Sequence, residues 1–287
     1  MLDRDIPATH AERGFSLVEL AVVMTILAFL LGGLLYTLSA QTEQRNFEET
    51  RRRLDQARDL ILAFAITNGR LPCPARNVAT GAPPTVMGDE VVTTAVGCVG
   101  DAITDYYGAI ISAGPPIVTG GFLPARSIGY QQVDSSGFAV DAWGNRLRYA
   151  VANLTTPAGP CPTPHFVNAV NLKTNGISCQ PNDLLICKSA TGITATTCGG
   201  ANNQVMSQSL VAAIIYSTGK NGATAPDAAT ATAAGRIDEA ANLNGDRIFV
   251  HHTPTSNGAV NGEFDDQFTW ITHGELYGKL IAAGVLP

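Results

Sequence analysis

The sequence predicts an α+β protein, in which a long N-terminal helix packs on a head built around an antiparallel sheet. Three observations lead to this fold class. An apolar N-terminal run continues into a segment whose apolar residues recur every three or four positions, which is typical of a helix. Alternating apolar residues further along the chain are typical of strands. Six cysteines all follow the apolar run, and they indicate insertions of the head that disulfides staple.

The apolar run has the properties of a transmembrane helix. It extends from Leu20 to Leu38 without a charged residue, which is close to the roughly 20 residues that cross a bilayer. A secretory signal peptide has a shorter core and a small-residue cleavage site after it. Two observations disagree about the orientation of this helix in the membrane. Arginines are denser after the run than before it, which favours a cytoplasmic head, whereas the cysteines favour an oxidising compartment for the head. We give the cysteines more weight.

One acidic residue stands out at the start of this run. Glu19 is the only charged residue between Arg13 and Glu43, and an acid within a spanning helix usually has a partner. Two interpretations remain from the residues alone. Glu19 is either solvated at the headgroup interface or paired with a cation.

The residues around Glu19 resemble a known motif. Gly14, Phe15, Ser16, Leu17, Val18 and Glu19, followed by the apolar stretch, are similar to the prepilin cleavage and methylation motif of type IV pilins and type II secretion pseudopilins. The resemblance implies a pilin-like fold, cleavage after Gly14 by prepilin peptidase and N-methylation of Phe15. It also implies that Glu19 meets the Phe15 amine of a neighbouring subunit during assembly. The leader is more acidic than family leaders usually are, and Tyr36 stands where many members have a proline.

The pattern divides the chain into three parts. Residues 1–14 are expected to be the leader peptide, 15–68 the transmembrane and assembly helix, and 69–287 a periplasmic globular head. A stripe from Phe47 to Phe64 continues the helix, and Asn68-Gly69 is a typical helix end. The arginines at 51–53 lie one turn from Glu48 and Glu49, so we interpret them as a paired, solvated helix face.

The head shows strand signals and two less regular stretches. Alternation on both sides of the sequence DAWGN predicts a hairpin over residues 138–151. This segment is similar to a hairpin of major pseudopilins. Further strands are expected in SLVAAIIYSTG, RIFVHHT and FDDQFTWIT, and a short helix in GELYGKLIAAGVLP. Residues 155–205 are expected to form a disulfide-stapled insertion, and residues 221–235, rich in Thr, Ala and Gly, a mobile surface loop.

The even number of cysteines suits three disulfides, for which fifteen pairings are possible. Proximity along the chain favours pairing each cysteine with its neighbour. A zinc site is disfavoured, because there is no C-x2-C pair and no histidine at finger spacing. The favoured pairs are Cys73 with Cys98, Cys161 with Cys179, and Cys187 with Cys198.

Oxygen-rich side chains near the C-terminus raise the question of a metal. Asp238, Asp246, Asp265 and Asp266 are ligands of the kind that Ca²⁺ prefers, and major pseudopilins bind calcium in a C-terminal loop. The spacing is not that of an EF-hand, and solvated turns are the simpler alternative. No nucleotide-binding, hydrolase or metalloprotease motif is present, so we expect no enzymatic activity and no certain cofactor.

These features predict a structural subunit, either a minor pilin or a pseudopilin, that spans the inner membrane once and then enters a periplasmic or surface filament. The expected partners are other pilin or pseudopilin subunits, prepilin peptidase, an inner-membrane assembly platform and membrane lipid. A net charge of −6 gives no expectation of nucleic acid, although DNA uptake stays open. The alternative is a membrane-tethered periplasmic enzyme or binding protein that uses the helix only as an anchor.

Overall fold

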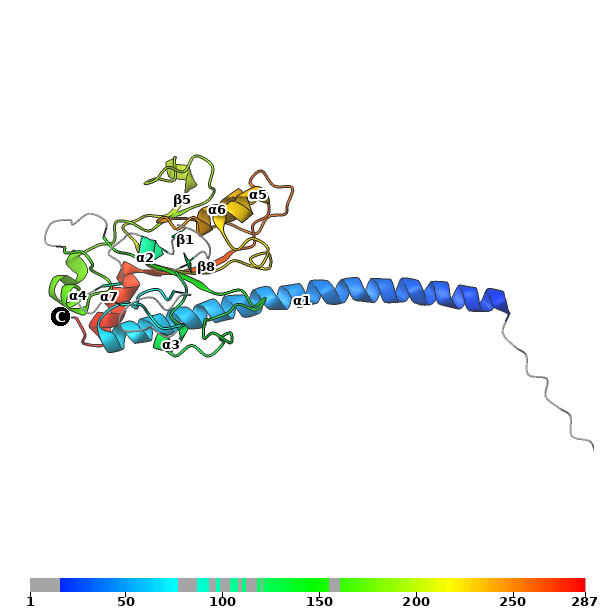
Figure 1. Cartoon of the computed structure of the whole chain (residues 1–287), viewed down its shortest axis with the longest axis horizontal. Helices are drawn as coiled ribbons and strands as arrows, with labels where there is room; N and C mark the ends of the chain where they lie inside the picture. Colours follow the sequence, from blue (N-terminus) through cyan, green and yellow to red (C-terminus); the bar gives the residue numbers. More distant parts are fainter. Residues whose placement is uncertain are drawn as a thin grey trace, which may run out of the picture. The chain divides into compact units, whose positions relative to one another are not determined.

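The computed structural model describes residues 16–76, 87–92, 97–98, 104–107, 110–111, 118–119, 121–154 and 161–286. The chain divides into two compact units, Met1–Asn46 and Phe47–Pro287. Helix α1 (Leu17–Asn68) begins in the first unit and ends in the second (Figure 1). The predicted end of the helix is confirmed: Gly69 has a φ of +68° and its amide bonds the Ala65 carbonyl at 2.8 Å. Among the described residues, no helix contains a stretch that is long and apolar enough to cross a membrane.

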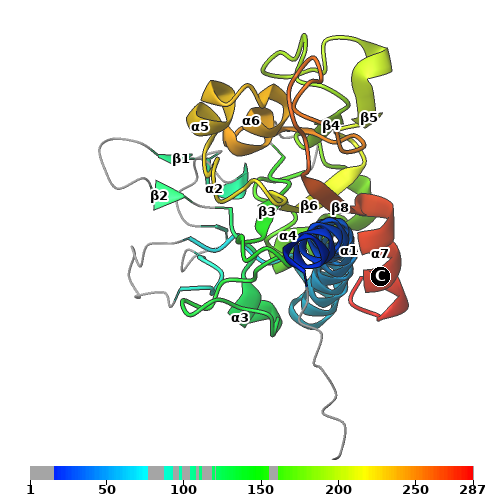
Figure 2. The same cartoon turned by 90° about the vertical axis from the view of Figure 1, so that its right-hand side faces the viewer.

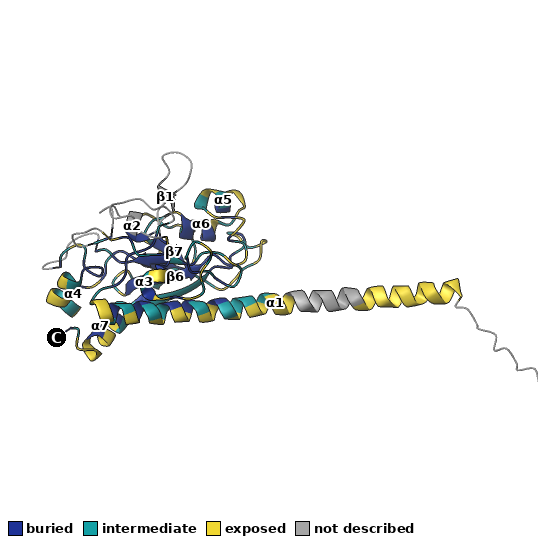
Figure 3. Cartoon of the chain, turned by 60° about the horizontal axis from the view of Figure 1, so that its bottom comes forward, coloured by how far each residue is buried: buried dark blue, intermediate teal, exposed yellow. Residues whose placement is uncertain are grey.

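The C-terminal half of α1 supplies one wall of the main core. The predicted apolar stripe of this helix is buried. Thr50, Leu54, Ala57 and Ile61 are almost inaccessible to solvent, and Figure 3 shows buried and exposed residues alternating along this half. Burial of one stripe of a helix at 3.6 periodicity is what holds a long amphipathic helix on a globular body.

The main sheet is antiparallel, as predicted, with the strand order β3-β6-β8. The central strand β6 (Val211–Ser217) is buried along its whole length, which explains its continuous apolar sequence. Strands β3 (Arg148–Val151) and β8 (Gln267–Thr272) flank it. Helix α7 (His273–Ala282) follows β8 directly, as expected, and buries Leu276 and Leu280. Figure 2 shows α7 beside the C-terminal half of α1, where Arg58 forms an ion pair with Glu275.

The predicted turn before β3 is organised by a buried carboxylate. Asp141 accepts hydrogen bonds from the amides of Trp143 and Asn145 at 2.9 and 2.8 Å and from the Ser217 hydroxyl at 2.6 Å. Gly144, with a φ of +88°, supplies the left-handed residue of the turn. The first strand of the expected hairpin is shorter than predicted, because residues 133–140 form only isolated bridges.

A second, mixed sheet corrects the prediction for residues 155–205. Strand β4 (Leu185–Cys187) lies in this segment and is the central strand of the order β5-β4-β7. It pairs antiparallel with β5 (Gln204–Met206) and parallel with β7 (Ile248–Val250). The segment therefore forms part of the fold as well as carrying four cysteines. A three-residue strand is too short to show periodicity, and this is why the sequence missed it.

The expected mobile loop at 221–235 is wrong in its second half. Helix α5 (Ala228–Ala233) forms there, capped by Asp227, whose side chain accepts the Thr230 amide at 2.8 Å. Alanine has the highest helix propensity, but the low-complexity composition of this segment was interpreted as that of a loop. Helix α6 (Ile237–Leu243) follows and lies beside α5 (Figure 2). The other elements are α2 (Thr104–Tyr107), β1 (Ile110–Ile111), β2 (Val118–Thr119), α3 (Ala125–Ile128), α4 (Ala169–Asn175), η1 (Gly176–Ser178) and η2 (Ala201–Asn203).

Three disulfides cross-link the head, with the pairing that proximity along the chain favours. They join Cys73 to Cys98, Cys161 to Cys179, and Cys187 to Cys198, across 25, 18 and 11 residues. All six sulfur atoms are consumed, so no free thiol is left for a metal site.

Candidate functional site

The first helical turn of α1 is closed by a capping box. The Glu19 amide donates to the Ser16 hydroxyl at 3.2 Å, and the Ser16 amide donates to the Glu19 carboxylate at 2.9 Å. This reciprocal pair satisfies two backbone amides that a helix N-terminus otherwise leaves without partners. Glu19 therefore has a local role that the sequence analysis did not assign, although Ser-x-x-Glu before an apolar run is a known signature. Gly14 and Phe15, the predicted processing residues, lie outside the described residues.

The turns that follow the capping box expose large apolar side chains. Leu17 and Phe29 leave 85 % and 80 % of their surface accessible, and Figure 3 shows exposed residues over this whole part of α1. Contiguous exposed apolar surface marks a contact with protein or lipid. The residues with large exposed side chains are Leu17, Val18, Leu20, Val22, Val23, Met24, Ile26, Leu27, Phe29 and Leu30.

The head contains a buried acidic cluster, formed by Glu239, Asp265 and Asp266. One carboxylate oxygen from each lies within 4.8 Å of the others, and all three side chains are buried. Glu239 comes from the first turn of α6, and the two aspartates immediately precede β8. The start of β8 thus brings two acids against an acid that is distant in sequence.

Hydrogen bonds hold this cluster but leave two oxygens free of partners. Glu239 accepts from the Asn221 side-chain amide at 2.8 Å and from the Asp265 backbone amide at 3.1 Å. Asp266 accepts from the Asn242 side chain at 2.8 Å. The Oδ1 atoms of Asp265 and Asp266 are buried and accept no hydrogen bond. A buried polar atom without a partner is uncommon in native proteins and calls for a ligand or a proton.

Burial raises the pKa of each acid in the cluster, and the Glu239 charge adds to this effect for the two aspartates. Burial comes first in every case. It raises the pKa of Asp265 to about 7, with the Glu239 charge as the next cause. It raises the pKa of Asp266 well above its usual range, again with help from Glu239, and it raises that of Glu239. Arg236, 3.7 Å from Glu239, offsets part of this repulsion. The cluster therefore keeps protons at pH values at which exposed carboxyl groups have lost them, and a bound cation would compete with these protons.

The cluster fits a hard divalent cation such as Ca²⁺ in the chemistry of its donors. Three carboxylates offer oxygen ligands, and two of their oxygens are free to bind. Gly219 leaves room beside them, since a Cβ on this residue would lie 2.0 Å from Asp265 Oδ1. Only a glycine permits the backbone to approach the carboxylate so closely.

Two of the four predicted calcium ligands lie elsewhere. Asp238 accepts from the Ala190 amide at 2.6 Å and from Asn261 at 2.9 Å, and it pairs with His252 at 3.1 Å. Asp246 accepts from the Ile248 amide at 2.7 Å. Both acids thus hold loops in place, and the structure brings Asp265 and Asp266 together with Glu239 rather than with Asp238 or Asp246. Helical periodicity could not separate these acids, because both Asp238 and Glu239 lie within one turn of Asn242 on α6.

Asn242 connects the cluster to the second sheet. Its side-chain oxygen accepts the Val250 amide at 2.6 Å and its nitrogen donates to the Val250 carbonyl at 3.0 Å. The amide therefore pairs with the edge of β7 as a neighbouring strand would. The same nitrogen bonds Asp266, so the position of that acid depends on the register of α6 against β7.

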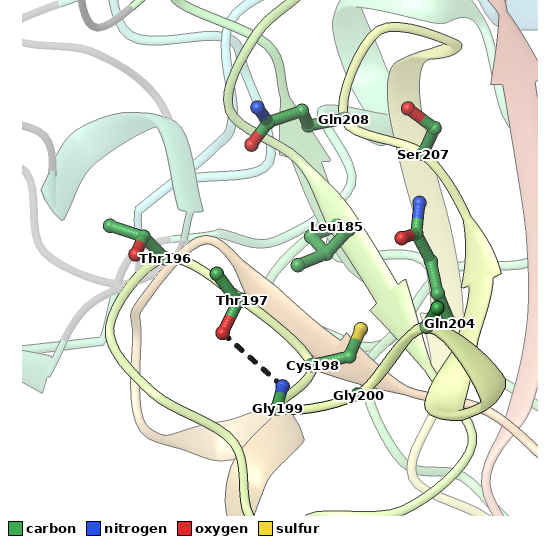
Figure 4. Close-up of a pocket in the computed structure, with 10 residues that line it drawn as sticks. Leu185, Thr196, Thr197, Cys198, Gly199, Gly200, Gln204, Ser207 and Gln208 are labelled. Atoms are coloured by element: carbon green, nitrogen blue, oxygen red, sulfur yellow. Dashed lines mark hydrogen bonds between the residues drawn. The ribbon is translucent and has the colours of Figure 1, made fainter.

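A separate hollow lies beside the Cys187–Cys198 loop, and the side chains that line it offer few groups for chemistry. It has a volume of about 290 Å³ and is lined by small or neutral polar side chains. Figure 4 shows Thr197 accepting the Gly199 amide, at 3.2 Å, within this wall. None of the lining residues carries a titratable group. The described lining residues therefore offer no side chain for acid–base chemistry.

Comparison with known proteins identifies the N-terminal feature alone. Residues 9–35 match the family described as the prokaryotic N-terminal methylation motif. This motif is the signature of type IV pilin and pseudopilin precursors. No curated protein and no solved structure matches the chain. The match includes Gly14, Phe15, Ser16 and Glu19, and it does not extend into the head.

Proposed function

We propose, on the basis of the methylation motif at residues 9–35, that this protein is a structural subunit of a filament. It would be a minor pilin or a pseudopilin of a type IV pilus-like or type II secretion filament, and it would have no catalytic turnover. Prepilin peptidase would cleave after Gly14 and Phe15 would be N-methylated. The motif is the single observation that carries this proposal, and the exposed apolar side chains of α1 support it.

Before assembly the subunit would cross the inner membrane once, with its head in the periplasm. The uncharged sequence from Leu20 to Leu38 supports this location, as do the three disulfides of the head. The same apolar side chains would later pack among neighbouring subunits. A head of this size suits a minor or tip position better than a repeating shaft.

The capping box suggests how Glu19 changes partner. In the isolated chain its carboxylate bonds the Ser16 amide. Cleavage places a new α-amino cation on Phe15, and the filament would bring such a cation from the neighbouring subunit. The exposed carboxylate would then exchange a local backbone bond for an intersubunit ion pair. Such a pair specifies axial register more than it adds stability.

We further propose that the acidic cluster of Glu239, Asp265 and Asp266 binds calcium and stabilises the head. The two unpartnered buried oxygens support this assignment. The ion would fix α6 against the start of β8. The role that we propose for the ion is structural, because it would connect an acid of α6 with the two acids that precede β8.

The decisive experiment is mass spectrometry of the native N-terminus, together with filament incorporation. In cells that contain the peptidase, the wild-type chain should begin at N-methylated Phe15. Glu19→Ala should insert and be cleaved but be poorly incorporated into filaments. Ser16→Ala is the matched control: it removes half of the capping box but leaves the carboxylate, and should assemble much better.

Two outcomes separate the alternatives. An unprocessed Met1 in those cells would overturn the filament proposal. Normal incorporation of Glu19→Ala into filaments would return Glu19 to a solvated residue at the headgroup interface. Full function of an unassembled Glu19→Ala subunit would favour a tethered enzyme or binding protein. Deletion then distinguishes the two filament classes: loss of export of folded periplasmic enzymes indicates a pseudopilin, and loss of surface pili, twitching or DNA uptake indicates a minor pilin.

A further inference from the structure

The sequence contains six asparagines that are followed directly by a glycine. In such a pair the side chain can lose ammonia, because the backbone nitrogen of the next residue attacks the side-chain carbonyl carbon and a glycine has no Cβ to hinder that approach. The reaction needs a mobile asparagine side chain and a glycine amide whose proton can leave. All six pairs lie within the described residues, and they begin at Asn68, Asn175, Asn221, Asn244, Asn257 and Asn261.

Five of the six asparagine side chains are held by a hydrogen bond. In each case the side-chain nitrogen, which has to leave as ammonia, donates to an oxygen at 3.0 Å or less. A side chain that must first give up this bond and change its rotamer reacts more slowly. The acceptors are the carbonyls of Phe64 and Asn171 for Asn68 and Asn175, the carboxylates of Glu239 and Asp246 for Asn221 and Asn244, and the Ser189 hydroxyl for Asn261.

Three of these five pairs are held at the glycine as well. The amides of Gly69 and Gly262 donate to backbone carbonyls at 2.8 and 3.0 Å, and the amide of Gly176 also donates to a backbone carbonyl. Exchange of such an amide proton requires local opening of the chain, and so does the loss of that proton before attack. The fold therefore shields these three pairs at both reacting groups.

Asn257 lacks both restraints. Within the part of the chain that the structure describes, neither its side chain nor the Gly258 amide makes a hydrogen bond. The two residues are exposed and occupy the central positions of a turn, which the Ala259 amide closes by donating to the Ser256 carbonyl at 2.9 Å. Apart from its chain neighbours, a Cβ on Gly258 would meet no atom within 4 Å. Asn257 thus combines an unrestrained side chain with an unbonded glycine amide.

The turn stands on a fixed base. Thr255 and Phe264 pair across the hairpin through backbone hydrogen bonds of 2.9 and 3.1 Å. Beyond the turn, the Asn261 side chain donates to Asp238 at 2.9 Å. A chemical change at Asn257 is therefore confined to the tip of this hairpin, which is the part of a loop that best tolerates change.

We propose that Asn257 is a site of spontaneous deamidation in the folded protein, and that the hydrogen bonds of the fold protect the other five pairs. The Gly258 nitrogen gives up its proton and bonds to the side-chain carbonyl carbon of Asn257, and the side-chain nitrogen leaves as ammonia. Water then adds to either carbonyl of the resulting succinimide ring and opens it to aspartate or isoaspartate. The reaction needs no oxidant, and the site does not depend on the filament proposal.

Both products change the surface of the hairpin tip. Each adds one negative charge at neutral pH, and isoaspartate also lengthens the backbone of the turn by one methylene group. Because the pairing of Thr255 with Phe264 holds the base, we expect the modified head to keep its fold. A partner that contacts this tip would meet a more acidic surface on old molecules than on newly made ones.

The test is peptide mapping by mass spectrometry. The full chain is incubated at mildly alkaline pH in detergent micelles and, in parallel, unfolded in guanidinium with a reductant. The deamidation rate of each of the six pairs is measured in both states, so that each pair is its own reference for the effect of local sequence. Gly258→Ala puts a Cβ beside the attacking nitrogen. Gly200→Ala is the matched control, because Gly200 also has free space around it and follows no asparagine.

We expect folding to slow deamidation at Asn257 by less than about tenfold, and at each of the other five pairs by more than about tenfold, a factor that corresponds to about 1.4 kcal/mol of protection. In the folded chain, Gly258→Ala should slow deamidation at Asn257 by at least about tenfold. Gly200→Ala should leave that rate unchanged.

Three results would overturn the proposal. Slowing of Asn257 by about tenfold or more in the folded chain would show that the turn itself protects this residue. Deamidation of any other pair as fast as that of Asn257 in the folded chain would show that the hydrogen bonds do not confer protection. An unchanged rate in Gly258→Ala would show that the Gly258 nitrogen is not the attacking group.

Discussion

Replacement of Asp265 by asparagine should make the calcium-free head more stable at neutral pH than the wild type. The pKa of Asp265 is raised from 3.8 to about 7, mainly by burial and then by the Glu239 charge. The sign follows from proton binding. Between these two pKa values the unfolded chain has lost the proton while the folded chain keeps it, so wild-type stability falls as the pH rises through this window. The asparagine side chain of the variant has no proton to lose.

The magnitude follows from the pKa difference. At 1.36 kcal/mol per pKa unit, a rise from 3.8 to about 7 corresponds to about 4 kcal/mol at pH 8. Coupling to Glu239 and Asp266 spreads this energy over the cluster, so we expect a measured difference of about 2–4 kcal/mol. The exchange is nearly isosteric, and the remaining amide oxygen keeps an acceptor for the Asn221 backbone amide, which bonds Asp265 at 3.3 Å.

The assay is urea unfolding at pH 4.5, 6 and 8 in a chelator, with wild type and variant compared at each pH. The comparison cancels other groups that titrate in this range, His165 above all. Asp59→Asn, an exposed acid of α1, is the control and should show no pH-dependent difference. Added calcium should reverse the order at pH 8 when the ion is at about 1,000 times its Kd, because it then adds about 4.1 kcal/mol to the wild type alone.

The reasoning fails if the difference between wild type and Asp265→Asn stays constant from pH 4.5 to 8. A constant difference would mean that Asp265 is ionised in the folded chain at all these pH values, and so that its surroundings are more polar than its burial suggests. A pH-dependent difference without any calcium response would support the protonated cluster and remove the metal from it.

Three further predictions concern other parts of the head. Burial lowers the pKa of His165 from 6.5 to about 4, so stability should fall by about 3 kcal/mol as the pH drops through this range, and His165→Gln should abolish that loss in acid titrations followed by circular dichroism. Replacing Cys187 and Cys198 together by serine opens an 11-residue loop and should cost about 3 kcal/mol in urea unfolding; an unchanged midpoint would contradict the loop-entropy estimate. Asp141→Ala removes three accepted hydrogen bonds and should lower the free energy of unfolding by at least about 3 kcal/mol, whereas Asp141→Asn should lower it by about 1 kcal/mol. Equal losses in the two variants would show that the hydrogen bonds of the turn are not the cause.

Local patterns predicted the elements of this fold that are long or strongly periodic. The end of α1 at Asn68, the buried strand β6 and the C-terminal helix α7 all follow from residue spacing within a short window. The disulfide pairing also agrees with chain proximity. For the end of α1 and for α7, the residues that decide the structure lie close in sequence. β6 pairs with the distant strands β3 and β8, but its seven residues are long enough to indicate a buried strand without them.

Elements that depend on distant partners were missed. β4 is a strand because β7, about 60 residues later, pairs with it, and its three residues carry no periodic signal. The acidic cluster shows the same limitation: Glu239 lies 26 residues before Asp265, and the choice of Asp238 instead came from composition alone. The Ser16–Glu19 capping box was a local signal, but the apolar run suggested a membrane role for Glu19 and drew attention away from it.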